Sequence, residues 1–336
     1  MTWRCTTTAA PSVRARRDET RSPLCALTCK LVCFADNFRH AFLVALAAWR
    51  FVVAGHLMSA SPGAPPPLGP LDVLALLLAA LCHDLEHPGT TNAYQVNTGS
   101  VLAQRYNDAS VLENHHCAVG MAMLGASGIL SSLSPEDKKT LRKSMIGAIL
   151  ATDMSVHRDL LVRVAAKVKA SQEDAEARAA EEASTDGGLD VSFCSAVPEV
   201  CFPTGSTDDR ALLVAFLLHC ADLHNPLLPP AMSQRIAGEL SREFAAQAAQ
   251  EQAASLPVTV MLGTTELQRA QMEISFIDFV VQPLYATLLT IVPSLADVAE
   301  RIETNRECWA SVLHTASMRR RSMERDMQRR SLDTRH

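Results

Sequence analysis

The chain has 336 residues, and its composition, 48% apolar with 14 Gly and 17 Pro, is ordinary for a globular protein. Its net charge of -5 gives no reason to expect nucleic acid as a partner. The 10 cysteines are spread along a chain too long and too apolar to be a disulfide-stapled mini-protein, so we expect reduced thiols and a cytoplasmic location.

Residues 1–36 show no sustained helical or strand period, which predicts a disordered segment or one foreign to the fold. Arg and Asp in this segment stand where a secretory signal would need an apolar core. Cys25, Cys29 and Cys33 recur at every fourth position and could suggest a metal cluster. Because no CxxC pair accompanies them, we interpret them as small apolar residues on one helix face.

Helical periodicity dominates the rest of the chain. The apolar run 41–53 contains Arg50 and the run 71–82 is shorter than the roughly 20 residues that span a bilayer, so both predict buried helices and no transmembrane segment. The Pro-rich stretch 59–70 predicts a loop. Further helices are predicted at 97–117, 119–133, 137–157, 208–222, 232–253, 266–290 and 292–313, and residues 159–184 are rich in Ala, Glu and Lys.

Between the helices, Pro and Cys in 185–208 indicate an insertion loop, whose bounds we place at about 171–208. The Arg-rich tail 315–336 could touch anionic lipid or RNA, but charge blocks this short are usually solvated helix extensions, which is the interpretation we favour. No strand alternation is visible. The sequence therefore predicts an all-α fold, a compact multi-helix bundle.

The strongest local signal for chemistry is HDLEH, in which His83 and Asp84 are adjacent and His87 follows one helical turn later. At the end of an apolar helix these groups would leave the core, and they offer N and O ligands to a divalent metal. A buried core histidine with a capping aspartate is the alternative explanation.

Two further clusters weaken that alternative. ENHH spans Glu113 to His116, and HCADLHN spans His219 to Asn225. Most of the 11 histidines lie in or beside such clusters, namely His40, His83, His87, His115, His116, His157, His219 and His224. Helix-borne His and Asp residues from several segments predict a metal site inside a helical bundle.

These motifs carry a family resemblance. The stretch HDLEHPGTTNAYQVNTGSVLAQRYNDASVLENHHCAV is similar to the signature region of class I cyclic nucleotide phosphodiesterases, a subset of the HD-type metal hydrolases. The resemblance continues through GAILATDMSVH, HCADLHNP, EISFIDFVVQPLY and ETNRECW, and covers residues 37–314. NFRHAF and RYNDASVLENHHCAV are most similar to the cGMP-selective high-affinity type. The family implies an HD-domain-like bundle with a metal-binding cleft, which hydrolyses 3′,5′-cyclic nucleotides to 5′-monophosphates in cyclic nucleotide signalling.

The resemblance also implies two divalent metals, zinc at the tighter position and magnesium or manganese at the other. The ligand positions match His40, His83, Asp84 and Asp222, with Asp84 bridging both metals. Two cations about 4 Å apart would neutralise the phosphate and lower the pKa of the bridging water. The expected partner is a cyclic nucleotide, and a homodimer is compatible with the family.

The same matching assigns residues around the metals. His87 is expected beside the bridging hydroxide, and Asn225 near the nucleotide base. Four residues are expected to hold metal-bound waters and to orient the ligands: Glu113, His116, Thr152 and Asp153. The alternative for each is a polar residue that packs between helices.

One departure from the family pattern concerns the base. Phe276 is present as the aromatic residue that grips the base, but Glu273 stands where the family has Gln. An ionised Glu only accepts hydrogen bonds, which suits the N1–H and N2–H donors of guanine better than the acceptor N1 of adenine. We therefore expect cGMP to be favoured over cAMP.

A second departure is Asp36, at the position where the family has a His that protonates the leaving O3′. Because a free Asp has a pKa of about 4 and cations nearby would keep it ionised, Asp36 has almost no proton to give at neutral pH. An evolved substitution or a gene-model error before Asn37 would explain it, and the error would leave apolar helix surface uncovered.

Three functions therefore follow from the sequence. The first is a cyclic nucleotide phosphodiesterase. The second is an impaired pseudoenzyme that binds metal and nucleotide, which Asp36 and Glu273 favour. The third is an HD-type hydrolase of other phosphoesters, which the presence of Phe276 and of ENHH disfavours.

Overall fold

The computed structural model describes residues 23–60, 65–185, 202–260, 263 and 265–333; within these, the side chains of 23–37, 178–185 and 328–333 are not described. Its elements are, in chain order, α1 (Pro23–Ala54), α2 (Pro70–Cys82), α3 (Asn92–Asn97), α4 (Val101–Tyr106), α5 (Val111–Ser127), α6 (Pro135–Leu150), η1 (Met154–Val156), α7 (His157–Thr185), α8 (Thr207–Asp222), η2 (Asn225–Leu227), α9 (Pro230–Ala253), α10 (Glu266–Phe276), the π-helical turn η3 (Ile277–Val281), α11 (Gln282–Ile291), η4 (Pro293–Leu295) and α12 (Asp297–Asp333). The described residues include no strand, so the predicted all-α fold is confirmed.

The centre of the bundle is α8. Every side chain from Leu212 to Ala221 is buried, because α1, α2, α6 and α7 all pack against this helix. Helix α2 is similarly apolar and contacts α1, α6 and α8. Helix α8 ends at Asp222, and His83 directly follows the last residue of α2, so a polar side chain lies at the C-terminal end of each central helix.

The predicted helix 97–117 is divided among the end of α3, all of α4 and the first part of α5. Gly99, Asn107, Asp108 and Ser110 all have positive φ angles, which an α-helix cannot contain. Polar side chains then begin two of the helices: Thr91 accepts a hydrogen bond from the Tyr94 amide, and Ser100 accepts one from Ala103.

Two regions are more helical than predicted. Residues 23–36, expected to be disordered, form the first part of α1, while residues 1–22 and the side chains of Cys25, Cys29 and Cys33 lie outside the described part. Helix α7 continues to Thr185, so 171–185 is not part of a loop; its Ala, Glu and Lys residues favour a helix. Residues 186–201 of the predicted insertion loop are not described.

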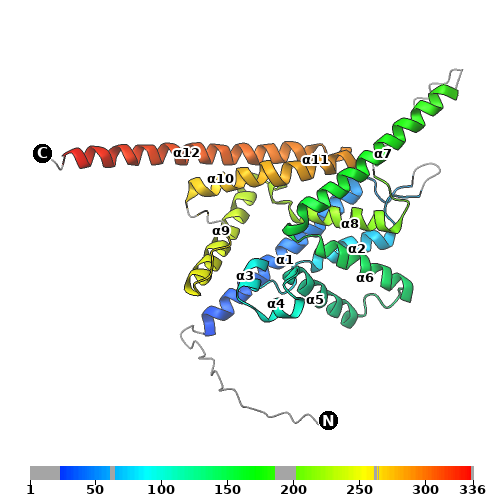
Figure 1. Ribbon diagram of the computed structural model, residues 1–336, viewed down its shortest axis with the longest axis horizontal. Coiled ribbons are helices and arrows are strands. Elements are labelled where there is room, and N and C mark those ends of the chain that lie inside the picture. The colour runs from blue at the N-terminus through cyan, green and yellow to red at the C-terminus, as the bar shows by residue number, and fades with distance from the viewer. Residues whose placement is uncertain (1–22, 61–64, 186–201, 261–262, 264, 334–336) are drawn as a thin grey trace, which may run out of the picture.

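The basic tail continues α12, which runs to Asp333 and, like α7, extends beyond the bundle (Figure 1). This agrees with the predicted helix extension. One continuous stretch of the described chain, Glu266–Ile291, is long and apolar enough to cross a membrane. Its residues Leu284, Tyr285 and Leu288 are buried in the core of this fold, where α11 contacts α8 and α12.

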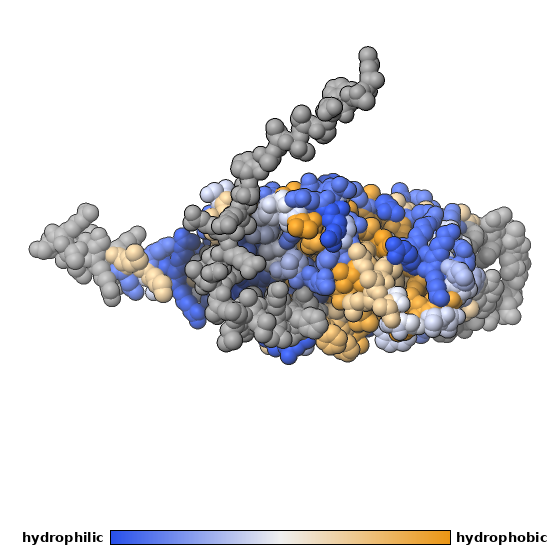
Figure 2. Space-filling model, turned by 90° about the horizontal axis from the view of Figure 1, so that it is seen from below, coloured by the Kyte–Doolittle hydropathy of each residue, from blue (hydrophilic) through white to orange (hydrophobic). Residues whose placement is uncertain are grey.

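Apolar side chains also lie on the surface, and Figure 2 shows several of them gathered on one face of the molecule. On α1 the exposed large apolar residues are Phe38, Phe42, Leu46, Trp49 and Val53. Their spacing of three or four residues places them on one face of the helix. Uncovered apolar surface is what a gene-model error before Asn37 would leave, and α1 carries such a surface.

Candidate metal centre

The middle of one helix and the C-terminal ends of two others, far apart in the sequence, bring the ligand candidates together. His40 lies in α1, His83 follows the last residue of α2, and Asp222 is the last residue of α8. His40 Nε2 lies 3.2 Å from His83 Nε2 and 3.0 Å from Asp222 Oδ1. His83 Nε2 lies 3.2 Å from the same carboxylate oxygen. The three atoms form a small triangle of possible metal ligands.

The dimensions of this triangle fit a metal ion. At ligand distances of about 2.0–2.1 Å, neighbouring ligand atoms stand about 2.9 Å apart around an octahedral ion and about 3.3 Å apart around a tetrahedral one. The observed separations of 3.0–3.2 Å fall within that interval. His83 Nδ1 donates to the carbonyl of Ala80 at 2.9 Å, which leaves the lone pair of Nε2 directed into the triangle.

The fourth predicted ligand, Asp84, lies slightly farther out. Its Oδ2 is 3.6 Å from Nε2 of both His40 and His83. The side chain of Asp84 is 30% exposed and that of His40 is 34% exposed, whereas that of His83 is 2% exposed. One side of the cluster is therefore open to solvent, as a site for an incoming substrate requires.

Charge at the cluster favours a cation. Burial opposes ionisation of Asp222, but His83 and His40 hold its pKa well below the usual range. Burial would lower the pKa of His83, but the carboxylates of Asp84 and Asp222 raise it to about 10. The cluster thus stabilises positive charge between its ligands, which a divalent cation would supply.

Two more histidines lie beside Asp84. His116 Nε2 is 3.8 Å from Asp84 Oδ1, while its Nδ1 donates to the carbonyl of Leu85 at 2.6 Å. Burial lowers the pKa of His116 to about 4, so this imidazole is neutral at physiological pH. His87 stacks at a tilt on His116, with ring centroids 5.9 Å apart. Both predicted residues are therefore near the cluster.

The carboxylates Glu113 and Asp153 are held by separate partners. Asn92 Nδ2 donates to Glu113 Oε2 at 2.9 Å. Burial raises the pKa of Glu113, the hydrogen bond from Asn92 lowers it, and the nearby charges of Asp153 and Asp84 raise it. Asp153 Oδ2 accepts from the hydroxyl of Ser110 at 2.7 Å. The Thr152 hydroxyl instead donates to the carbonyl of Ile149 at 2.8 Å.

The predicted base-binding residues lie on other elements. Glu273 and Phe276 are in α10, directly before the π-helical turn η3, a feature often found at functional sites. Burial raises the pKa of Glu273 to about 7, against the opposing charge of Arg269. Asn225 starts η2, and its buried Oδ1 has no hydrogen-bond partner among the described residues. No hydrogen bond among the described residues joins these side chains to the metal cluster.

His224, which the sequence did not single out, contacts the cluster through His40. Its ring stacks on His40 with centroids 6.0 Å apart, and its Nδ1 donates to the carbonyl of Ala221 at 2.7 Å. Burial lowers its pKa to about 4. The HCADLHN motif contained His224, but no family role singled it out.

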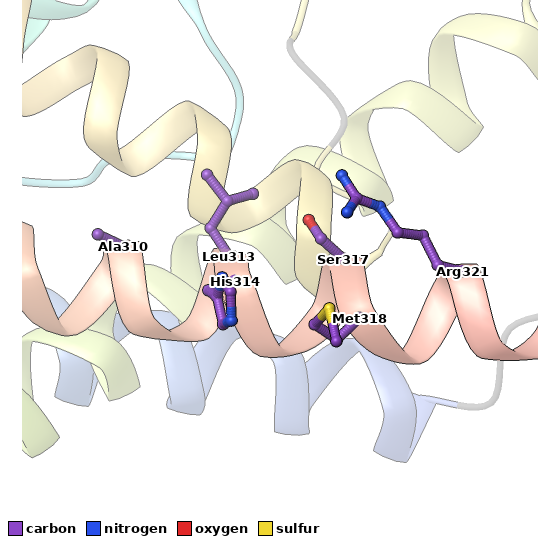
Figure 3. A pocket seen from close by; sticks show the side chains of 6 residues that line it. All are labelled: Ala310, Leu313, His314, Ser317, Met318 and Arg321. Atoms are coloured by element: carbon purple, nitrogen blue, oxygen red, sulfur yellow. The ribbon is translucent and has the colours of Figure 1, made fainter.

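A hollow of about 280 Å³ lies elsewhere, along α12 (Figure 3). It is lined by Ala310, Leu313, His314, Ser317, Met318 and Arg321, and in the figure Leu313, Ser317 and Arg321 point toward one side of the helix. None of these six residues belongs to the metal cluster.

Together, the all-α fold and the His–Asp cluster define a helical domain with a candidate metal centre. Residues 36–302 match the family model of 3′5′-cyclic nucleotide phosphodiesterases. The chain is 32% identical over 263 residues to 3′,5′-cyclic-AMP phosphodiesterase 4C of Mus musculus, covering 77% of this chain and 35% of that protein. It is 33% identical over 247 residues to 3′,5′-cyclic-AMP phosphodiesterase, isoform F, of Drosophila melanogaster, covering 73% of this chain and 34% of that protein.

A solved structure supports the same family. The phosphodiesterase domain of the RhoPDE fusion protein from the choanoflagellate Salpingoeca rosetta matches with a TM-score of 0.69 and 30% sequence identity, covering 84% of this chain and 78% of that one. The chain belongs to the 3′,5′-cyclic nucleotide phosphodiesterase family. It spans about a third of the length of the mouse and fly relatives.

Glu273 provides a test of the local environment in α10. Its folded-state pKa of about 7 lies above the ordinary value of 4.5, so the folded state holds this proton more tightly and stability falls as pH rises from about 4.5 through about 7. Glu273→Gln should therefore gain about 2 kcal/mol of unfolding free energy over the wild type between pH 5 and pH 8. Urea unfolding at both pH values measures this. Glu266→Gln, on the exposed surface of the same helix, is the control, and an equal pH dependence in wild type and Glu273→Gln would contradict the prediction.

Proposed function

We propose that this chain hydrolyses 3′,5′-cyclic nucleotides to 5′-monophosphates in cyclic nucleotide signalling, with two divalent metals held by His40, His83, Asp84 and Asp222. The observation that carries the proposal is the triangle of His40, His83 and Asp222 atoms with metal-ligand spacing, next to Asp84 in an opening to solvent. The mouse and fly relatives, named as cyclic-AMP phosphodiesterases, support the reaction class. Incubating the chain with cGMP or cAMP and Mg²⁺ or Mn²⁺, and following the 5′-monophosphate, tests it.

The bound metals would neutralise the phosphate and make water a better nucleophile. Residues of the chain itself orient the histidine rings and the carboxylates of the site. The hydrogen bond from His83 to Ala80 fixes the ring so that Nε2 faces the site, and the one from His116 to Leu85 does the same beside Asp84. Asn92 and Ser110 restrain the carboxylates of Glu113 and Asp153, which we assign to metal-bound waters.

For the base, we infer that the protonation state of Glu273 decides the purine preference. Ionised, its two oxygens accept from N1–H and N2–H of guanine. Protonated, the carboxyl has both a donor and an acceptor, which suits the N1 acceptor and N6–H donor of adenine. Because the pKa of Glu273 is raised to about 7, both states are populated near neutral pH. Above about pH 7, where Glu273 is ionised, cGMP is then favoured over cAMP.

A pH series tests this preference. The ratio of kcat/KM for cGMP to kcat/KM for cAMP should rise severalfold between pH 6 and pH 8 in the wild type, because Glu273 loses its proton in this interval. Taking a ratio cancels pH effects on the metals and the water, which both substrates share. In Glu273→Gln the ratio should stay flat. A flat ratio in the wild type, or the same rise in the variant, would remove Glu273 from base selection.

The second candidate is a binding module without turnover, which Asp36 favours because an ionised carboxylate cannot protonate the leaving oxygen. Asp36 lies in α1, one turn before His40, and its side chain is outside the described part. Calorimetry with cGMP distinguishes the candidates. Tight binding with negligible hydrolysis would support the module, and absence of binding would exclude it.

A further inference from the structure

Three residues of α9 contact three residues of the segment 87–94, which begins at the last residue of the HDLEH motif. Glu243 Oε1 lies 4.0 Å from His87 Nδ1. One turn later Gln247 bonds Thr91, and Gln250 then accepts a hydrogen bond from the Tyr94 hydroxyl at 3.1 Å. Residues of α9 spaced by four and three thus meet residues of the 87–94 segment spaced by four and three.

The central contact of this series is buried. Gln247 is 1% exposed and Glu251, one turn later, is 0% exposed. Gln247 Oε1 accepts from the backbone amide of Thr91 at 2.8 Å, and its Nε2 lies within bonding distance of Thr91 Oγ1, Glu251 Oε1 and Thr259 Oγ1. Because an ionised Glu251 only accepts and a backbone N–H only donates, the two together fix which end of the Gln247 amide faces Thr91.

Glu251 is itself held in the acceptor state. Burial opposes its ionisation, but hydrogen bonds from Thr259 and Gln247 lower its pKa. The Thr259 amide donates to its Oε2 at 3.0 Å. Both Oε1 and Nε2 of Gln247 therefore have hydrogen-bond partners. Removing either atom would leave a buried polar group of Thr91 or Glu251 with one partner fewer.

From Thr91 the contacts lead to the metal centre. The next residue, Asn92, donates from Nδ2 to Glu113 Oε2 at 2.9 Å and accepts at Oδ1 from the Leu112 amide at 2.9 Å. Glu113 lies in α5 one turn before His116, whose Nε2 is 3.8 Å from Asp84 Oδ1. Gln247 is thus connected to the metal centre by Thr91, Asn92 and Glu113.

We propose that Gln247 is a positioning residue of the metal centre: by fixing Thr91 it sets the place of Asn92, and through it the Glu113 carboxylate. This inference rests on the metal-dependent function proposed above. It assigns to α9, which carries no predicted metal ligand, an effect on metal affinity.

The test is Mn²⁺ binding to the full chain, measured by calorimetry without nucleotide. Gln247→Met keeps the size of the side chain and removes its hydrogen bonds. We expect Mn²⁺ affinity about tenfold weaker, the lower end of the effect of losing a residue that orients metal ligands. Gln250→Met, which breaks only the exposed contact with Tyr94, is the matched control and should bind like the wild type.

A double-mutant cycle with Glu113→Gln separates positioning from general destabilisation. If Gln247 acts through Glu113, Gln247→Met should weaken Mn²⁺ binding little or not at all in the Glu113→Gln background. Unchanged affinity in Gln247→Met with only a lowered Tm, or full additivity, would overturn the proposal. If Gln247→Met does not fold, Gln247→Glu, which keeps the acceptor for Thr91, replaces it and should show an intermediate loss of affinity. Failure of both to fold would make Gln247 structural only, whereas no Mn²⁺ binding by the wild type would instead overturn the metal site itself.

Discussion

Asp222→Asn is expected to lower the turnover of cyclic nucleotides by about 10³-fold or more. The carboxylate of Asp222 contacts both His40 and His83, and its neutral amide would remove the charge that makes the cluster attract a cation. A bound metal supplies several kcal/mol of transition-state stabilisation, and each 1.36 kcal/mol is worth a factor of about ten in rate. Initial rates of 5′-monophosphate release with saturating Mn²⁺ measure the loss.

The control for this prediction lies on the same helix. Asp208 is at the start of α8, with its side chain 85% exposed and paired to Lys143 on the surface. Asp208→Asn should keep wild-type turnover and metal affinity. If Asp222→Asn is folded, as judged by thermal unfolding, and turns over cyclic nucleotide at the wild-type rate, Asp222 is no metal ligand.

Asp36→His should raise turnover by about 10²–10⁴-fold, the usual contribution of a positioned general acid. Positions 36 and 40 are one turn apart in α1, so they share a helix face, and a His at 36 would carry a proton near neutral pH where Asp36 does not. The measurement is kcat for cGMP and cAMP with Mn²⁺, compared with the wild-type chain.

Asp36→Asn distinguishes proton donation from simple removal of a charge. It loses the carboxylate without gaining a titratable group, so its turnover should stay at the wild-type level. An equal increase in the His and Asn variants would show that Asp36 inhibits by its charge. No increase in either variant would show that position 36 does not supply the leaving-group proton.

The fold class and the places of His83 and Asp222 were predictable from local signals, because long apolar runs that end in His or Asp predict buried helices with polar residues at their ends. His40 was matched only by the family resemblance, and the structure places it beside the other two. The split of 97–117 into three helices was not predictable from apolar spacing, because the apolar period continues across residues whose φ is positive.

Other features depend on the tertiary fold alone. Gln247 and Glu251 lie in a polar, Ala-rich helix and look like solvent-exposed residues, but contacts of α9 with Thr91 and Thr259 bury them. The raised pKa of Glu273 likewise comes from burial that an isolated helix would not provide. His224 stacks on His40 because η2 follows α8 directly, a geometry that no spacing rule gives.

The most direct test of the proposed metal-dependent phosphodiesterase activity is the formation of 5′-monophosphate by the Asp36→His variant. The variant is incubated with cGMP or cAMP and Mn²⁺, and 5′-monophosphate is quantified with and without a chelator and in the Asp222→Asn background. We predict product from at least one cyclic nucleotide, abolished by the chelator and by Asp222→Asn. The absence of 5′-monophosphate from both nucleotides, in a folded variant that binds Mn²⁺, would contradict the proposed activity.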